Sequence, residues 1–340
     1  MNPTVTTASA RYNENIALGA IGADVRDYHR IADAVAADIA AGRLRPGERL
    51  PPQRVFARRH RIANSTAARV YGELGRRGLV IGEVGRGTFV RAHAAEPALV
   101  DPGGAPVDLQ LNFPVLPEQA ALLASSLATM LRPDVLADAL RAGGVTGTAP
   151  ARAAAADLLT RNGWRPKQDQ ILFTGNGKQS LAATIAAVVP VGGRLGVEEL
   201  TYPVVRTIAT RLGITAVPLE MDDQGVLPDA LRTSAVRAVY LQPALHNPLG
   251  ITMPDARRAE VVAVLEELDL PLIEDGVYTF LCDEPPLAAL APDRTVLVDS
   301  LSKRIAPGLT LGFVVPPARL ADQIATAVRG GGWTAPRFAV

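Results

Sequence analysis

The stretch SLSKRIAPGL, residues 300–309, contains one of only three lysines in a chain that has 35 lysine and arginine residues. A lysine amine can lose its proton and attack an aldehyde to form a Schiff base, whereas an arginine guanidinium stays protonated. Lys303 follows the apolar run Thr295–Val298, which is typical of a strand, and precedes the turn signal Pro307-Gly308. We therefore expect Lys303 on a short loop at the end of a strand. This stretch alone leaves open the alternative of a solvated surface lysine.

Composition indicates a globular chain of more than one domain. The chain has 340 residues, of which 48% are hydrophobic and 20% are charged. No apolar run is long enough to span a bilayer, and the first residues lack the pattern of a signal peptide. A single cysteine, Cys282, excludes a disulfide bond within the chain. We therefore expect a cytoplasmic protein, and we predict no metal site.

Charge is distributed unevenly along the chain. Residues 21–93 contain fourteen arginines and seven acidic residues, a net charge of +7, while the rest of the chain has a net charge of −6. Such an asymmetry predicts a basic module that binds a polyanion, joined to a more acidic domain.

Residues 27–92 have the pattern of a winged helix-turn-helix, a small α+β domain. Apolar residues recur at helical spacing, and glycine and proline separate the helices. The expected elements are helices over 28–41, about 51–60 and 65–77, the last capped by Asn64, then a hairpin formed by 79–81 and 88–90. In such a domain the third helix enters the major groove of DNA. Residues 1–26 are predicted to be a flexible arm, and residues 93–107, rich in proline and glycine, a linker.

This module resembles the DNA-binding domain of GntR-type bacterial regulators. The resemblance rests on PGERLP at 46–51, YGEL at 71–74 and GRGTFV at 85–90. It implies that double-stranded operator DNA is the partner. Pro52 stands where the family usually has serine. By this resemblance, the residues that contact DNA are Arg49, Arg54, Ser65, Thr66, Arg69, Arg86 and Gly87.

From residue 108 onward, apolar β-type runs alternate with helical stretches. This alternation predicts an α/β domain with a mainly parallel sheet, whose ligands lie beyond the carboxyl ends of the strands. The glycine-rich turn TGNGKQS, residues 174–180, opens a helix and suits a phosphate. Asp275 ends an apolar run, where a carboxylate needs a cationic partner. Tyr202 could stack on an aromatic ring, although a tyrosine taken alone more often serves packing. Asn247 could donate to a phenolate oxygen, although an asparagine before proline also shapes a turn.

These residues, with Lys303, describe a pyridoxal 5′-phosphate site, and residues 108–340 resemble the fold-type I aminotransferases. The resemblance rests on the Asn247-Pro248-x-Gly250, Asp275-x-x-Tyr278 and Ser302-Lys303 motifs. It implies that Lys303 forms the Schiff base and that Asp275 pairs with the ring nitrogen. Asn247 and Tyr278 would bind the ring hydroxyl oxygen, and Tyr202 would stack on the ring. The implied cofactor-binding residues are Gly177, Lys178, Tyr202, Asn247, Asp275, Tyr278, Ser300, Ser302, Lys303 and Arg304.

A winged helix ahead of such a domain resembles the MocR/GabR-type subfamily of GntR regulators. That resemblance implies a transcriptional regulator and a head-to-tail homodimer. It further implies that an amino compound displaces Lys303 to form an external aldimine and changes DNA binding, or that the cofactor is itself the signal. Two alternatives remain: an aminotransferase fused to a DNA-binding domain, and a DNA-binding protein with an inert aminotransferase-like dimerisation scaffold.

Three departures from the subfamily bear on these expectations. Thr310 replaces the usual phosphate-binding arginine, and we expect Arg304 to compensate. The glycine-rich 142–145 lacks the tyrosine that commonly reaches the partner's phosphate. The sequence ends at Val340, where we expect the start of a helix, so the large domain is expected to be C-terminally incomplete and to lack the arginine that binds a substrate carboxylate.

Overall fold

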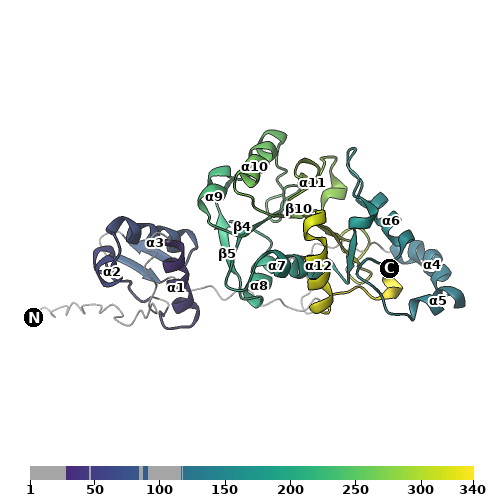
Figure 1. Cartoon of the computed structure of the whole chain (residues 1–340), viewed down its shortest axis with the longest axis horizontal. Coiled ribbons are helices and arrows are strands. Elements are labelled where there is room, and N and C mark those ends of the chain that lie inside the picture. Colours follow the sequence, from purple (N-terminus) through teal and green to yellow (C-terminus); the bar gives the residue numbers. More distant parts are fainter. Residues whose placement is uncertain (1–27, 46, 84–86, 91–115, 117) are drawn as a thin grey trace, which may run out of the picture. The chain divides into compact units, whose positions relative to one another are not determined.

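The computed structural model describes residues 28–45, 47–83, 87–90, 116 and 118–340 (Figure 1). The chain divides into two compact units, Met1–Asp108 and Leu109–Val340. The predicted arm 1–26 and linker 93–107 lie outside the described residues.

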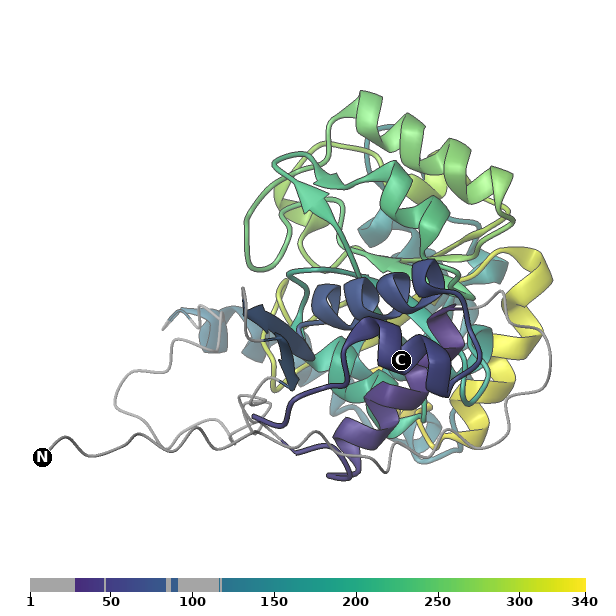
Figure 2. The ribbon, with the colours of Figure 1, turned by 90° about the vertical axis from the view of Figure 1, so that its left-hand side faces the viewer.

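The first unit is the winged helix-turn-helix that the sequence predicts, drawn in purple to blue in Figure 2. Its elements are α1 (Tyr28–Ala40), α2 (Gln53–Arg59), α3 (Asn64–Arg76), β1 (Val80–Glu83) and β2 (Gly87–Val90). The strands form an antiparallel hairpin in which Ile81 pairs with Phe89. The expected cap is wrong: Asn64 is already helical, and Ala63 occupies the N-cap position without a side-chain hydrogen bond.

Aromatic packing and a buried ionic cluster hold these helices together. The rings of Phe56 and Tyr71 meet edge to face at 5.3 Å, and the Tyr71 hydroxyl donates to the Pro51 carbonyl. Glu73 of α3 is buried and accepts from Arg76 and Arg77. Burial alone would raise the pKa of Glu73, but His29, Arg77 and Arg76 hold it well below its usual range. A carboxylate with these partners stays ionised at the junction of α1 and α3.

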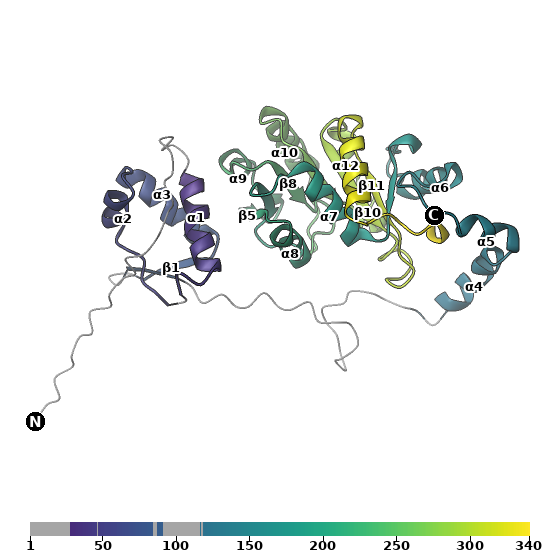
Figure 3. The same cartoon turned by 60° about the horizontal axis from the view of Figure 1, so that its bottom comes forward.

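The second unit is an α/β domain built on a mainly parallel sheet. Within the described residues the sheet has seven strands in the order β3-β11-β10-β9-β8-β4-β5. β11 is antiparallel to both of its neighbours, and the remaining pairs are parallel. Figure 3 labels β5, β8, β10 and β11 of this sheet, which follow one another in that order across the view. The strands are β3 (Leu172–Thr174), β4 (Arg194–Glu198), β5 (Thr215–Leu219), β8 (Ala238–Leu241), β9 (Leu272–Asp275), β10 (Thr295–Ser300) and β11 (Gly312–Val315).

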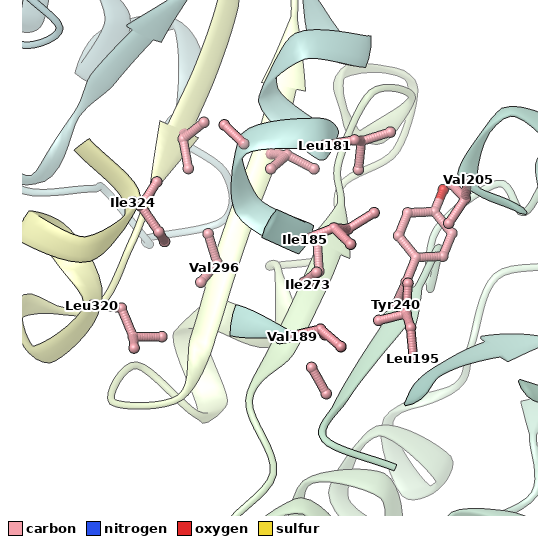
Figure 4. Close-up of a cluster of buried hydrophobic side chains, with 14 of the residues drawn as sticks. Leu181, Ile185, Val189, Leu195, Val205, Tyr240, Ile273, Val296, Leu320 and Ile324 are labelled. Carbon is pink, nitrogen blue, oxygen red and sulfur yellow. The ribbon is translucent and has the colours of Figure 1, made fainter. Parts of the chain in front are cut away.

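Helices cover both faces of this sheet. α7 (Gly177–Val188), α8 (Pro203–Arg211) and α12 (Ala318–Gly330) pack on one face, where Ile185 and Ile324 meet Ile273 and Val296 (Figure 4). α9 (Pro228–Thr233), α10 (Asp255–Glu267) and α11 (Leu287–Leu290) pack on the other face. Successive strand residues point to opposite faces, so the strands are apolar throughout rather than alternating.

Shorter elements complete the unit: α4 (Gln119–Met130), α5 (Pro133–Ala139), α6 (Ala149–Leu159), the hairpin β6 (Met221–Asp222) and β7 (Gly225–Val226), and the 3₁₀ turns η1 (Gln168–Gln170), η2 (Thr279–Leu281) and η3 (Arg337–Ala339). In the described part of the chain no single helix has the length and hydropathy to cross a membrane. The bent pair α4 and α5 reaches that length and hydropathy only when the two helices are taken together.

The last residues return to the sheet. Thr334 forms a bridge with Thr174 at the edge strand β3, and the Gly175 amide donates to the Trp333 carbonyl at 3.2 Å. The expected start of a helix is therefore wrong, because η3 is a single 3₁₀ turn.

Candidate cofactor site and DNA-binding surface

Parallel strands bring the predicted cofactor residues to one edge of the sheet. α7 begins at Gly177 after β3, Tyr202 follows β4, and Asn247 follows β8. Asp275 is the last residue of β9, and Lys303 lies three residues beyond β10. Because the carboxyl ends of these strands point the same way, residues far apart in the sequence share one site.

Asp275 is a buried carboxylate, and each of its oxygens accepts a hydrogen bond from a neutral donor. Oδ2 accepts from the Tyr240 hydroxyl at 2.7 Å, and Oδ1 accepts from the Val277 amide at 3.1 Å. Burial raises the pKa of Asp275 to about 6, even though both hydrogen bonds act against the rise. An acid in this environment gains most from a cationic group brought by a ligand.

Two other buried carboxylates at the same edge have a basic partner within the chain. His246 Nε2 lies 3.2 Å from Glu198 Oε2, and Arg304 Nη2 lies 2.5 Å from Asp299 Oδ2. Among the described residues Asp275 has no ion pair of this kind. A protonated pyridine nitrogen is a cation that could pair with Asp275.

Lys303 is half-buried beside the Tyr278 ring, with Nζ 5.5 Å from the ring centroid. Burial lowers the pKa of its amine, and the nearby Lys178 lowers it further, while Asp275 opposes both. A lowered pKa increases the neutral fraction of the amine, which is the form that attacks an aldehyde.

The start of α7 and the loop after β10 lie against each other and carry several polar groups. A Cβ atom on Gly177 would lie 3.0 Å from Ser300 Oγ, so the helix N-terminus packs directly against this hydroxyl. Ser302 Oγ lies 2.6 Å from Thr310 Oγ1, which places further hydroxyls on the same loop. Backbone amides at a helix N-terminus together with serine hydroxyls suit a phosphate, and Lys178 lies in the first turn of α7.

Arg304 is paired with a buried carboxylate of the same chain. Its guanidinium pairs with Asp299 and lies over the Phe280 ring, with Cζ 4.9 Å from the ring centroid. The side chain is only 7% exposed. A buried carboxylate thus holds one end of the guanidinium, and the replacement of the usual phosphate arginine by Arg304 stays a prediction.

Tyr202 and Asn247 border the same region. Burial raises the pKa of Tyr202 to about 12, and Asp275 and Tyr278 add to the rise, which indicates that all three lie near one another. The backbone N–H of Asn247 donates to Gln242 Oε1 at 2.9 Å, and the backbone N–H of Gln242 donates to Glu198 Oε2 at 3.0 Å. These bonds fix the backbone that carries Asn247.

In the first unit, α3 presents a polar face opposite its core face. Ser65 and Arg69 are exposed and Thr66 is half-buried, while Val70 and Leu74 are fully buried. The guanidinium carbon of Arg69 lies 5.8 Å from the centroid of the Tyr28 ring. Positions i, i+1 and i+4 of one helix thus form a single edge that can reach bases. Arg54, on α2, is also exposed.

Arg49 lies across Gly87 of the hairpin. A Cβ atom on Gly87 would be 2.6 Å from Arg49 Nε, and the glycine has φ of +118°. Arg49 also forms a β-bridge with Phe89. The structure therefore joins two predicted DNA-binding residues, whereas Arg86 lies outside the described residues.

Comparison with known families agrees with both halves of this description. Residues 27–90 match the family described as "Bacterial regulatory proteins, gntR family", and residues 136–336 match "Aminotransferase class I and II". The HTH-type transcriptional regulator YdeF of Bacillus subtilis is 31% identical over 309 residues, which cover 88% of this chain and 67% of YdeF. The chain belongs to the MocR-type GntR regulators.

Other relatives of this MocR-type chain carry similar names. The pyridoxine biosynthesis transcriptional regulator PdxR of Corynebacterium glutamicum is 28% identical over 299 residues, covering 85% of this chain and 65% of PdxR. The chain thus spans about two thirds of the length of these relatives. Among solved structures, the α-aminoadipate aminotransferase LysN of Thermus thermophilus has a TM-score of 0.59 at 24% identity, covering 70% of this chain and 61% of LysN. At this identity the likeness shows the fold.

Sequence reasoning missed Tyr240, Gln242 and Glu198. Tyr240 stands within the apolar run of β8, where its hydroxyl has no local signature. Glu198 ends β4 just as Asp275 ends β9, so an acid at the end of an apolar strand was the one signal that could have found it.

Proposed function

We propose that this MocR-type chain is a DNA-binding transcriptional regulator whose large unit binds pyridoxal 5′-phosphate at Lys303 and responds to an amino compound. The observation that carries the proposal is Asp275, a buried carboxylate with two neutral donors and no ion pair among the described residues, at the edge that also bears Lys303. A cofactor with an aldehyde and a basic ring nitrogen matches both groups.

Each side chain has a defined task at this site. When bound, the cofactor supplies an aldehyde for which Lys303 and an amino compound compete. Asp275 holds a proton on the ring nitrogen, and Tyr202 covers the ring. Asn247 and Tyr278 bind the ring hydroxyl oxygen. The residues that bind the phosphate are Gly177, Lys178, Ser300 and Ser302.

The DNA-binding unit would use α3 and the hairpin. Ser65, Thr66 and Arg69 would contact base edges in the major groove, and Arg49 and Arg54 would contact phosphates. An amino compound regulates DNA binding only if it binds two conformations of the protein with different affinity. The expected assembly is a homodimer, matching the two half-sites of a palindromic operator.

A second candidate signal is the cofactor itself. The name of the relative PdxR connects that protein with pyridoxine biosynthesis. In this version the loaded and empty forms of the chain differ in operator affinity without any added amine. An aminotransferase is a third candidate, and turnover of amino acid and keto acid pairs distinguishes it from a regulator.

The first experiment is a visible absorption spectrum of the purified chain with added pyridoxal 5′-phosphate, beside Lys303→Ala and the control Lys167→Ala, an exposed lysine. We expect a visible band with the wild-type chain and the control, and none with Lys303→Ala. Operator duplexes selected from a random library then report DNA affinity with and without amino compounds. If the wild-type chain shows no band, the remaining hypothesis is that the large unit is an inert dimerisation scaffold.

A further inference from the structure

The Tyr240 hydroxyl is a buried group to which no role has been assigned. Tyr240 lies in β8, between β9 and β4, and its side chain is fully buried among α7 and α8 residues on one face of the sheet (Figure 4). A buried phenol needs a hydrogen-bond partner, and this one reaches Asp275 of the neighbouring strand at 2.7 Å. The bond therefore joins the sheet core to the acid of the cofactor site.

Asp275 lies among groups that mostly oppose its negative charge. Burial raises the pKa of Asp275 most, the Tyr240 hydroxyl and the Val277 amide lower it, and Asp299 and Glu198 add to the rise. The titratable groups around Asp275 are Glu198 at the end of β4, Tyr240 on β8, Glu274 on its own strand, Asp299 on β10, Tyr202 before α8 and Lys303 on the loop after β10. Of the two hydrogen-bond donors, only Tyr240 is a side chain that substitution can remove.

We propose that Tyr240 is a positioning residue for the cofactor: its hydroxyl keeps Asp275 ionised and fixes the carboxylate toward the ring nitrogen. This inference deepens the proposed function and rests on it. Since Oδ2 accepts from Tyr240 and Oδ1 from Val277, rotation of the carboxylate would break both bonds. Tyr240→Phe keeps the ring in the core and removes only the donor.

The test measures affinity for pyridoxal 5′-phosphate by titrating the visible band across pH. For the wild-type chain, affinity falls as pH drops through the pKa of Asp275, because protonated Asp275 must lose its proton before it pairs with the pyridinium. Tyr240→Phe raises that pKa, so the fall begins at higher pH and binding at neutral pH weakens by about tenfold or more. The control is Tyr71→Phe, which removes a buried phenol bond in the DNA-binding unit and leaves the titration unchanged.

A double-mutant cycle separates charge from packing. In an Asp275→Asn background, Tyr240→Phe should cause no further loss, because there is no carboxylate to hold ionised. If Tyr240→Phe weakens binding equally in both backgrounds, or leaves the pH profile unmoved, the role of Tyr240 is packing alone and the inference is overturned. Absence of a band in the wild-type chain would instead overturn the proposed function, so the two failures are distinguishable.

Discussion

Arg304 Nη2 donates to Asp299 Oδ2 at 2.5 Å, and both side chains are almost fully buried. In the sequence Asp299 lies four residues before Lys303, and Arg304 directly follows it. The last residues of β10 and the lysine loop are thereby joined by an ion pair. Arg161 lies close enough to act on the same pair: its pKa is lowered by burial and by Arg304, and raised by Asp299. The loop that carries Lys303 is thus fixed by charges beneath it.

Removing one partner of this pair should destabilise the large unit. Arg304→Met leaves Asp299 buried without its cation, and losses of about 3–5 kcal/mol are typical of such changes. Urea unfolding followed by tryptophan fluorescence reports the large unit, because both tryptophans, Trp164 and Trp333, belong to it. Arg304→Met combined with Asp299→Asn should recover most of the loss. A double variant no more stable than Arg304→Met would contradict the pairing.

A side chain at Gly87 should weaken DNA binding. Gly87→Ala forces alanine into φ near +118°, a strain of about 1–3 kcal/mol, and displaces the Arg49 guanidinium. We expect lower operator affinity and a salt dependence reduced by about one phosphate contact. Gly82→Ala is the matched control, since no atom lies within 4 Å of its added Cβ. Equal affinities for the two variants would show that Arg49 does not need Gly87.

Lys178 should supply the charge that Thr310 cannot. Thr310 bonds to Ser302 and Arg304 is held by Asp299, which leaves Lys178 in the first turn of α7 as the candidate cation for the phosphate. Lys178→Gln should weaken cofactor binding by about tenfold, the loss expected for a charge-assisted bond. It should also raise the pKa of Lys303 by removing a repulsion. Less of the amine is then neutral, so the visible band should form more slowly at neutral pH than in the wild-type chain and reach the wild-type rate only at higher pH.

The control for this change is Lys167→Gln, an exposed lysine away from α7. Should Lys178→Gln bind the cofactor as tightly as this control, the phosphate would be held by amides and hydroxyls alone.

The sequence pattern predicted which residues lie at the carboxyl ends of the strands, but it did not predict the side chains that bond to them. Lys303 and Asp275 each follow an apolar run, and parallel strands necessarily bring such ends together. The ion pair of Arg304 could not be predicted, because Asp299 stands inside the run of β10, where only the packed structure shows that its side chain is buried and needs a cation. Tyr240 reaches Asp275 across 35 residues, a distance at which periodicity carries no information. Asn64 was predicted as the cap because asparagine favours that position, but α3 begins one residue earlier than expected and includes Asn64.

Without cofactor, the large unit should lose stability as pH rises from about 4 to about 7. Burial raises the pKa of Asp275 to about 6 and that of Glu274 to about 7, so both carboxyls bind a proton more tightly in the folded chain than in the unfolded one. Their contribution is fully present below the ordinary carboxyl pKa and is lost as pH rises through the folded values. For Asp275 the shift corresponds to about 3 kcal/mol.

Urea unfolding across this range, followed by the two tryptophans, measures the loss, and Asp275→Asn provides the comparison. Asparagine has no proton to lose, so the slope of stability against pH should become shallower between about 4 and 6, while the part due to Glu274 remains. Saturating cofactor should have the same effect on the wild-type chain, because a pyridinium partner lowers the pKa of Asp275 again. If the slope is the same with and without cofactor, the ring nitrogen does not pair with Asp275, and the acid serves only the fold.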